Sequence, residues 1–132
     1  MKTNIILSLV IIFICFWTNS IYSQSITLDW AISTGGVSED RCEDITTDIY
    51  GNVYLTGSFS GTVDFDPGKG VLNLTSSYKT LFIQKLDKKG NLIWVKTVGG
   101  TNDSQGNSIN VDALGNVYVT GSFWGAILGG VL

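Results

Sequence analysis

Two stretches of this sequence are nearly identical, and their starting points lie 64 residues apart. Residues 51–59 read Gly-Asn-Val-Tyr-Leu-Thr-Gly-Ser-Phe, and residues 115–123 repeat this string with one change, Leu to Val. At the same offset, and without a gap, residues 30–61 and 94–125 share 14 identities in 32 positions. A fixed period of this size is typical of proteins built from stacked or radially arranged structural repeats. The repeat therefore constrains the architecture much more than it constrains the ligand.

Each repeat has the pattern of β-strands. Apolar Val53, Leu55 and Phe59 alternate with residues bearing hydroxyl groups, which is the period-two signature of a strand with two different faces. After residue 24 we find no sustained helical period. The sequence therefore predicts an all-β fold. The expected strands up to residue 98 are residues 45–47, 53–59, 81–86 and 92–98.

A second motif, Asp-x-x-Gly-Asn, begins at Asp48, Asp87 and Asp112, each time between predicted strands. Aspartate at the first position of a turn accepts hydrogen bonds from the amides that follow, and glycine supplies the positive φ that a type I turn with a bulge requires. Two tight hairpins, joined by a longer connection at residues 60–79, give a four-stranded antiparallel unit. Such a unit is one β-propeller blade. A stacked solenoid, the main alternative, does not account for the tight hairpins.

We divide the chain into a leader at residues 1–23, a first repeat at residues 24–93 and a second, shorter repeat at residues 94–132. About one and two-thirds repeats are present, which predicts antiparallel four-stranded blades in an incomplete propeller. After Gly125 the sequence departs from the first repeat. We expect either a truncated piece of a longer protein or a small protein that forms a ring from several copies. Unpaired strand edges would promote such self-association.

The first 23 residues have the layout of a secretory signal peptide. Lys2 gives a positive start, residues 5–17 form an apolar core, and a polar segment leads to an expected cleavage site after Ser23. The 13-residue core is shorter than the roughly 20 residues of a membrane-spanning helix, which favours cleavage over an uncleaved anchor. We therefore expect an exported protein, secreted or at the cell surface, with no stable membrane span after cleavage.

The residues that carry chemistry give little support for catalysis. The chain has no histidine, the usual general base and the commonest metal ligand. After the leader, 7 basic and 11 acidic side chains give a formal charge of −4, which provides no basic face for nucleic acid. Cys42 is the only cysteine after the leader, and Gly106 is its repeat partner. We expect Cys42 to be a small buried or half-buried residue.

Asp64 and Asp66 are the candidate metal ligands. They flank Phe65, so in an extended segment both carboxylates project to one side, as in fragments of calcium sites. Calcium takes about six to eight oxygen ligands, and the full loop motif of a calcium site is absent. We therefore expect these carboxylates to stabilise the turn, with a calcium site as the alternative, and we expect no other cofactor.

Residues 48–68 resemble the bacterial β-propeller repeat family called SBBP, named for a seven-bladed β-propeller. The family's hallmark is similar to Asp-x-x-Gly-Asn-Val-Tyr-Val-Thr-Gly-Ser-Phe followed by Gly-Thr-Val-Asp-Phe-Asp-Pro-Gly, and residues 112–125 match its first part. The resemblance implies a propeller in a large secreted or surface protein of bacteria, and it is nearly silent on activity.

These observations predict a non-catalytic exported scaffold or interaction module that binds an unknown protein or surface glycan. Two other functions stay open at this point. The chain could be part of a secreted hydrolase or lyase whose active site lies in blades that are not present. It could also be a calcium- or carbohydrate-binding surface module, since the loops of propellers often carry binding sites.

Overall fold

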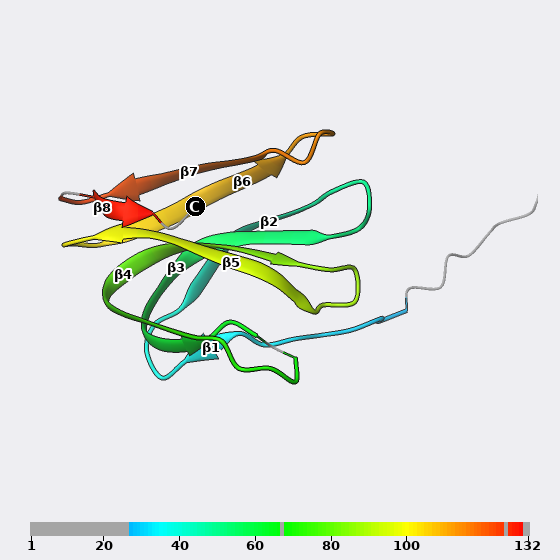
Figure 1. Cartoon of the computed structure of the whole chain (residues 1–132), viewed down its shortest axis with the longest axis horizontal. Coiled ribbons are helices and arrows are strands. Elements are labelled where there is room, and N and C mark those ends of the chain that lie inside the picture. Colours follow the sequence, from blue (N-terminus) through cyan, green and yellow to red (C-terminus); the bar gives the residue numbers. More distant parts are fainter. Residues whose placement is uncertain (1–26, 67, 126, 131–132) are drawn as a thin grey trace, which may run out of the picture.

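The computed structural model describes residues 27–66, 68–125 and 127–130, so the predicted leader at residues 1–23 lies outside it. The described residues form eight strands and no helix, which confirms the all-β prediction (Figure 1). The strands are β1 (Gly35–Gly36), β2 (Arg41–Thr47), β3 (Val53–Asp64), β4 (Asn73–Leu86), β5 (Leu92–Gly100), β6 (Ser104–Val111), β7 (Val117–Phe123) and β8 (Ile127–Gly130).

β2, β3, β4 and β5 form the predicted four-stranded antiparallel unit, each strand pairing with the next along the chain. β6 and β7 begin the second unit as a separate hairpin, and the sheets do not close on themselves (Figure 1). The prediction of antiparallel blades in an incomplete propeller is confirmed. The first four-stranded unit runs from residue 41 to residue 100, so our division between residues 93 and 94 falls inside β5. A repeating sequence can be divided at any point of its period. The boundary chosen from the sequence is therefore shifted along the chain relative to the boundary of the blade.

The connection that we expected at residues 60–79 is mostly strand. β3 and β4 continue beyond Phe59 after a bulge, and Val63 pairs with Leu74 in this extension. Thr62 and Thr75 lie opposite each other with their hydroxyl oxygens 2.8 Å apart, a pair that stabilises antiparallel strands. The extra length of the repeat is therefore a long hairpin, in which β3 ends at Asp64 and β4 begins at Asn73.

The Gly-Gly pair of each repeat makes the same strand contact. Gly36 in β1 pairs with Val63 in β3, and Gly100 in β5 pairs with Ile127 in β8. The two contacts are one repeat period apart. Although the sequence after Gly125 departs from the first repeat, the backbone at Ile127 keeps the pairing of Val63.

The three Asp-x-x-Gly-Asn turns have the geometry that the sequence predicts. Gly51, Gly90 and Gly115 adopt φ values of 81°, 83° and 86°. In the third turn, the Oδ1 atom of Asp112 accepts hydrogen bonds of 2.9 Å from the amides of Leu114 and Asn116. The carboxylates of Asp48 and Asp87 accept the corresponding bonds in their own turns. Each aspartate therefore fixes the register of its hairpin.

An aromatic cluster forms the core of the first blade. The ring of Phe65 lies 5.0 Å from that of Phe59 and 5.2 Å from that of Phe82, measured between centroids. The Nε2 atom of Gln84 donates a 2.8 Å hydrogen bond to the carbonyl of Phe65. The loop after β3 is thus folded back onto its own blade.

Candidate interaction surface

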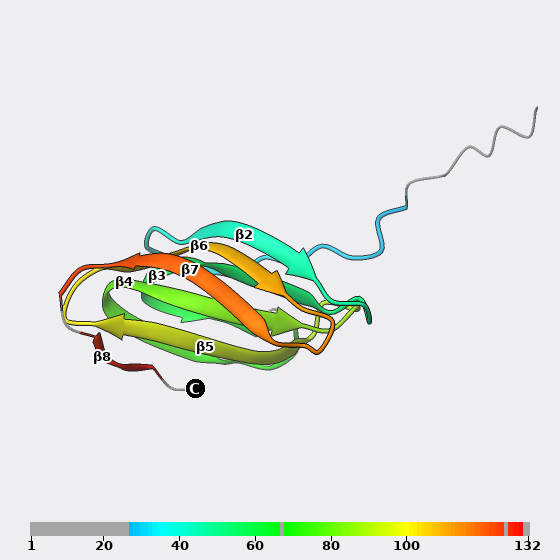
Figure 2. The same cartoon turned by 90° about the horizontal axis from the view of Figure 1, so that it is seen from above.

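The two repeats meet where β6 packs against β2, β3 and β4 (Figures 1 and 2). Successive side chains of a strand point to opposite faces. In β3, the face that carries Tyr54, Thr56 and Ser58 is turned toward β6, and we call it the trailing face. The opposite face, which carries Leu55 and Phe59, is the leading face.

Asp44 in β2 joins the repeats. Its Oδ2 atom accepts a 2.7 Å hydrogen bond from the hydroxyl of Ser108 and a 2.9 Å bond from the amide of Ile109. Its Oδ1 atom accepts a 2.9 Å bond from the amide of Ile45. The bonds from Ile109, Ser108 and Ile45 together hold the pKa of Asp44 below its ordinary value of 3.8.

Further polar contacts surround this junction. The Nε2 atom of Gln105 donates a 2.9 Å hydrogen bond to the carboxylate of Glu43. Deeper in the interface, the hydroxyl of Ser104 accepts a 3.0 Å bond from the amide of Leu81 and donates a 2.8 Å bond to the carbonyl of Val98. The buried end of β6 is therefore satisfied by backbone groups of the first blade.

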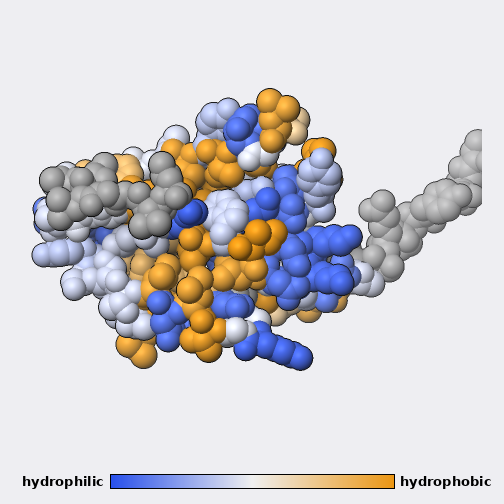
Figure 3. Space-filling model, viewed as in Figure 1, coloured by the Kyte–Doolittle hydropathy of each residue, from blue (hydrophilic) through white to orange (hydrophobic). Residues whose placement is uncertain are grey.

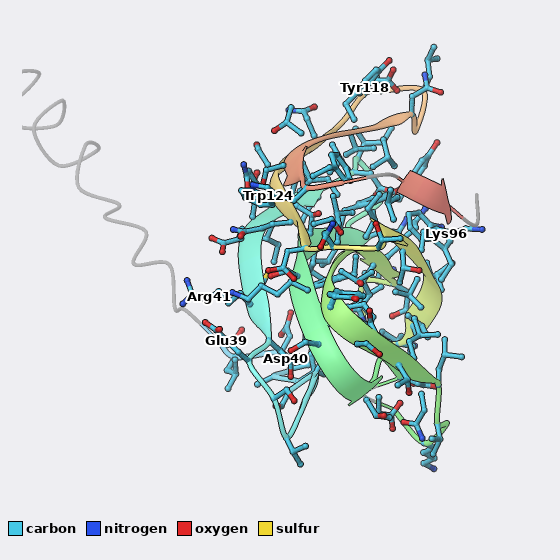
Figure 4. The ribbon with its side chains drawn as sticks, turned by 90° about the vertical axis from the view of Figure 1, so that its left-hand side faces the viewer. Glu39, Asp40, Arg41, Lys96, Tyr118 and Trp124 are labelled. Carbon is cyan, nitrogen blue, oxygen red and sulfur yellow. The ribbon has the colours of Figure 1, made fainter. Side chains whose placement is uncertain are left out.

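Sequence reasoning did not identify Asp44 as a junction residue. It belongs to the acidic segment at residues 39–44, whose ordinary interpretation is a solvated loop. Part of the segment does have this character, because Glu39 forms an exposed ion pair with Arg41 (Figure 4). Glu39 also pairs with Lys79. The available signal was that Ser108, the repeat partner of Asp44, carries a hydroxyl that can donate to a carboxylate.

Gly106 allows a close approach between the repeats. A Cβ atom at this position would lie 3.2 Å from the Cβ atom of Thr56 and 3.3 Å from the amide nitrogen of Gly57, and closer still to the Oγ1 atom of Thr56. Real Cβ contacts are rarely this short. The junction therefore requires glycine in this position of β6.

Equivalent residues of the two repeats have opposite exposure. Ile109 faces the junction and is 4% exposed, whereas its partner Ile45 is 59% exposed. Tyr54 is 1% exposed and packs against Trp94 and Lys85 of its own blade, whereas its partner Tyr118 is 59% exposed and projects from β7 (Figure 4). Each repeat thus has one face made to receive a neighbour and one made to pack onto a neighbour. The trailing face of the second repeat and part of the leading face of the first are open.

Apolar side chains gather across the middle of one side of the molecule (Figure 3). Such patches on a soluble protein mark interaction sites. Among the residues after β1 whose burial the structure describes, the exposed large apolar side chains are spread over several strands and turns: Val37, Ile45, Ile49, Tyr50, Val71, Leu72, Tyr78, Ile93, Leu114, Tyr118, Phe123 and Trp124.

The candidate calcium ligands serve the loop after β3. The Oδ1 atom of Asp64 accepts hydrogen bonds from the amides of Asp66 (3.0 Å) and Leu72 (2.8 Å), and that of Asp66 accepts a 2.9 Å bond from the amide of Gly68. Within the described part of the chain, no group of three or more His, Cys, Asp or Glu side chains is placed to hold a metal ion. The calcium site stays a prediction, which a Ca²⁺ titration followed by tryptophan fluorescence would test.

Acidification is expected to destabilise the protein. Hydrogen bonds from the side chain and amide of Asn91 lower the pKa of Asp87, and those of Asn116 lower that of Asp112, from an ordinary value of 3.8. The folded state therefore binds these protons more weakly than the unfolded state does. The stabilisation is fully present above the unfolded pKa and is lost as the pH falls through the folded pKa.

Urea unfolding from neutral to strongly acidic pH would measure this dependence. The variants Asp87→Asn and Asp112→Asn keep a hydrogen-bond acceptor but cannot titrate, so the free energy of unfolding should depend less steeply on pH in acid. An unchanged acid slope in both variants would contradict the assignment.

The four-stranded antiparallel blade and the packing of the second repeat on it together define this chain as a repeat protein of the propeller type. Residues 93–129 match the family model described as the SBBP β-propeller repeat, so the recognition of this repeat type is confirmed. The chain is also 32% identical, over 109 residues, to an uncharacterized WD repeat-containing protein of Acanthamoeba polyphaga mimivirus. That alignment covers 71% of this chain and 8% of the viral protein, so the chain spans a small part of the relative's length. No solved structure gives a significant match.

The described part of the chain offers no helix with the length and apolarity that a bilayer crossing needs.

Proposed function

We propose that this propeller-type interaction module is a non-catalytic scaffold that is exported and binds another protein or a glycan outside the cell or at its surface. The support for export is the signal-peptide layout of residues 1–23, and the support for a non-catalytic role is the lack of histidine in the sequence. The interaction role is supported by the open faces of the two repeats.

A single observation carries the interaction role: Tyr54 and Tyr118 are the same residue of the repeat, yet one is buried and the other exposed. A tyrosine that is covered in one repeat has the size and polarity to be covered in the next, because its ring is apolar and its hydroxyl can form hydrogen bonds. The free trailing face of the second repeat is therefore the surface most suited to a partner.

Replacing Tyr118 by arginine tests this role. The wild-type protein and the Tyr118→Arg variant, both immobilised, are exposed to the exported proteins and glycans of the source cells, and bound molecules are identified. We expect a partner that the variant loses. The variant Leu114→Arg, at an exposed turn position of the same hairpin, is the control and should keep it. Equal binding by all three proteins would place the interaction elsewhere.

Export is tested separately. When the full chain is expressed in a bacterial host, we expect the mature protein outside the cytoplasm to begin at Gln24, as read by mass spectrometry. The variant Ile11→Arg places a charge in the apolar core of the leader and should keep the chain inside and uncleaved. A membrane-bound product that still begins at Met1 would support the uncleaved anchor instead.

A further inference from the structure

Cys42 occupies the position in the first repeat that Gly106 occupies in the second. The backbone environment is the same in both repeats, because Cys42 pairs with Gly57 as Gly106 pairs with Gly121. The thiol is partly covered where it lines a cavity, and this burial raises the pKa of Cys42. The residue as a whole is nevertheless exposed, so the expectation of a buried or half-buried residue is wrong. The reason is that no neighbouring repeat covers this part of β2 in the structure.

The side chain of Cys42 extends over the leading face, where it lines a cavity together with Leu55 and Phe59. At the junction between the repeats, the corresponding space beside Gly106 is filled by Thr56 of the neighbouring blade. A blade that packed on the leading face of the first repeat in the same manner would bring its own threonine onto Cys42. The first repeat therefore cannot dock on a neighbour as the second repeat does.

The exposed trailing face of the second repeat, in contrast, suits a neighbour that has no side chain at the position of Cys42. Tyr118 and Thr120 are exposed there, and their partners Tyr54 and Thr56 are 1% and 0% exposed. Thr56 lies against Gly106 of β6. The strand that covers Thr56 brings a glycine against it. Thr120 is the repeat partner of Thr56. A strand that covers Thr120 in the same way therefore requires glycine at the position of Gly106.

We propose that the trailing face of the second repeat binds a β-propeller repeat whose first strand carries glycine at the position of Gly106, and that Cys42 excludes a second copy of this chain from that face. This inference rests on the proposed interaction role and names the kind of partner. The inference concerns docking between the faces of two sheets. Pairing between free strand edges is a different kind of association, and a side chain on the leading face does not control it.

The chain itself is the probe. In reducing buffer, so that thiols form no disulfides, the mass of the wild-type protein and of Cys42→Gly is measured by analytical ultracentrifugation over a range of concentrations. Removing the side chain lets β2 of one copy dock on β7 of the next. A head-to-tail contact of this kind should raise the average mass by about twofold or more over wild type.

Three matched variants make the result specific. Cys42→Ser keeps a side chain of similar size and should behave as wild type. Cys42→Gly combined with Thr120→Arg should return to the wild-type mass, because the arginine blocks the receiving face. Thr120→Gly alone makes room for Cys42 from the opposite side and should assemble, even if Cys42→Gly fails to fold.

The proposal is overturned if neither glycine variant exceeds the wild-type mass, if Cys42→Ser assembles equally, or if Thr120→Arg leaves assembly unchanged. Since no natural partner is needed, a negative result here leaves the interaction role itself intact. A failed search for a partner would, conversely, leave the selectivity of Cys42 and Gly106 intact.

Discussion

Phe59→Ala is expected to destabilise the protein by about 3–5 kcal/mol, the usual cost of truncating a buried aromatic side chain. Phe59 is 1% exposed, and its ring meets Phe65 edge-on at a centroid distance of 5.0 Å. Phe65 is held in place by the hydrogen bond from Gln84, so the cluster has little freedom to collapse into the space. Urea unfolding of the purified variant would measure the loss.

The repeat supplies the control for this prediction. Phe123 is the same residue of the repeat, one period later, but it is 42% exposed. Phe123→Ala removes the same atoms and should cost about 1 kcal/mol or less, as surface substitutions do. Equal losses at both positions would mean that the leading face of the first blade is not the core of this molecule.

Local rules account for what the sequence predicted correctly. The Asp-x-x-Gly-Asn turns depend on one carboxylate, one glycine and the amides between them, all within five residues. The alternation of Val53 and Leu55 with Tyr54 and Thr56 is also a local property of one strand. Four such strands joined by tight turns leave few antiparallel arrangements, so the blade followed from the turns.

The features that the sequence did not predict depend on distant segments. Asp64, Phe65 and Asp66 read as a turn, and the two carboxylates do bind loop amides. The ring between them lies in the core because the extended hairpin folds it onto Phe82, a contact that no pattern within the loop encodes. Long-range packing of this kind is not visible in periodicity.

The junction shows the same limit. The role of Asp44 depends on which strand of the next repeat approaches β2, and the repeat partner Ser108 differs in chemical type. Comparing the repeats at aligned positions predicts the framework, because shared residues such as Tyr54 and Tyr118 mark the common fold. The differences, Asp44 against Ser108 and Cys42 against Gly106, mark where one blade is distinguished from the other.

Gly106→Ala is expected to loosen the junction and to destabilise the protein by about 1–3 kcal/mol, the usual cost of overpacking a tight contact. The new methyl group would press on Thr56, whose hydroxyl is fixed by a 2.8 Å hydrogen bond to the carbonyl of Phe82 and so cannot move away freely. Hydrogen exchange should speed up at the amide of Ile109, because that amide is bonded to Asp44 across the junction.

A double-mutant cycle attributes the effect to this contact. Thr56→Ala alone removes the hydroxyl that Gly106→Ala meets, so the two substitutions together should cost less than the sum of their separate losses. Asn107→Ala, at the next and exposed position of β6, should change the free energy of unfolding by about 0.5 kcal/mol or less. Strict additivity in the cycle would show that Gly106 serves the local strand and not the approach of the two repeats, and the selectivity proposed for Cys42 would lose its physical basis.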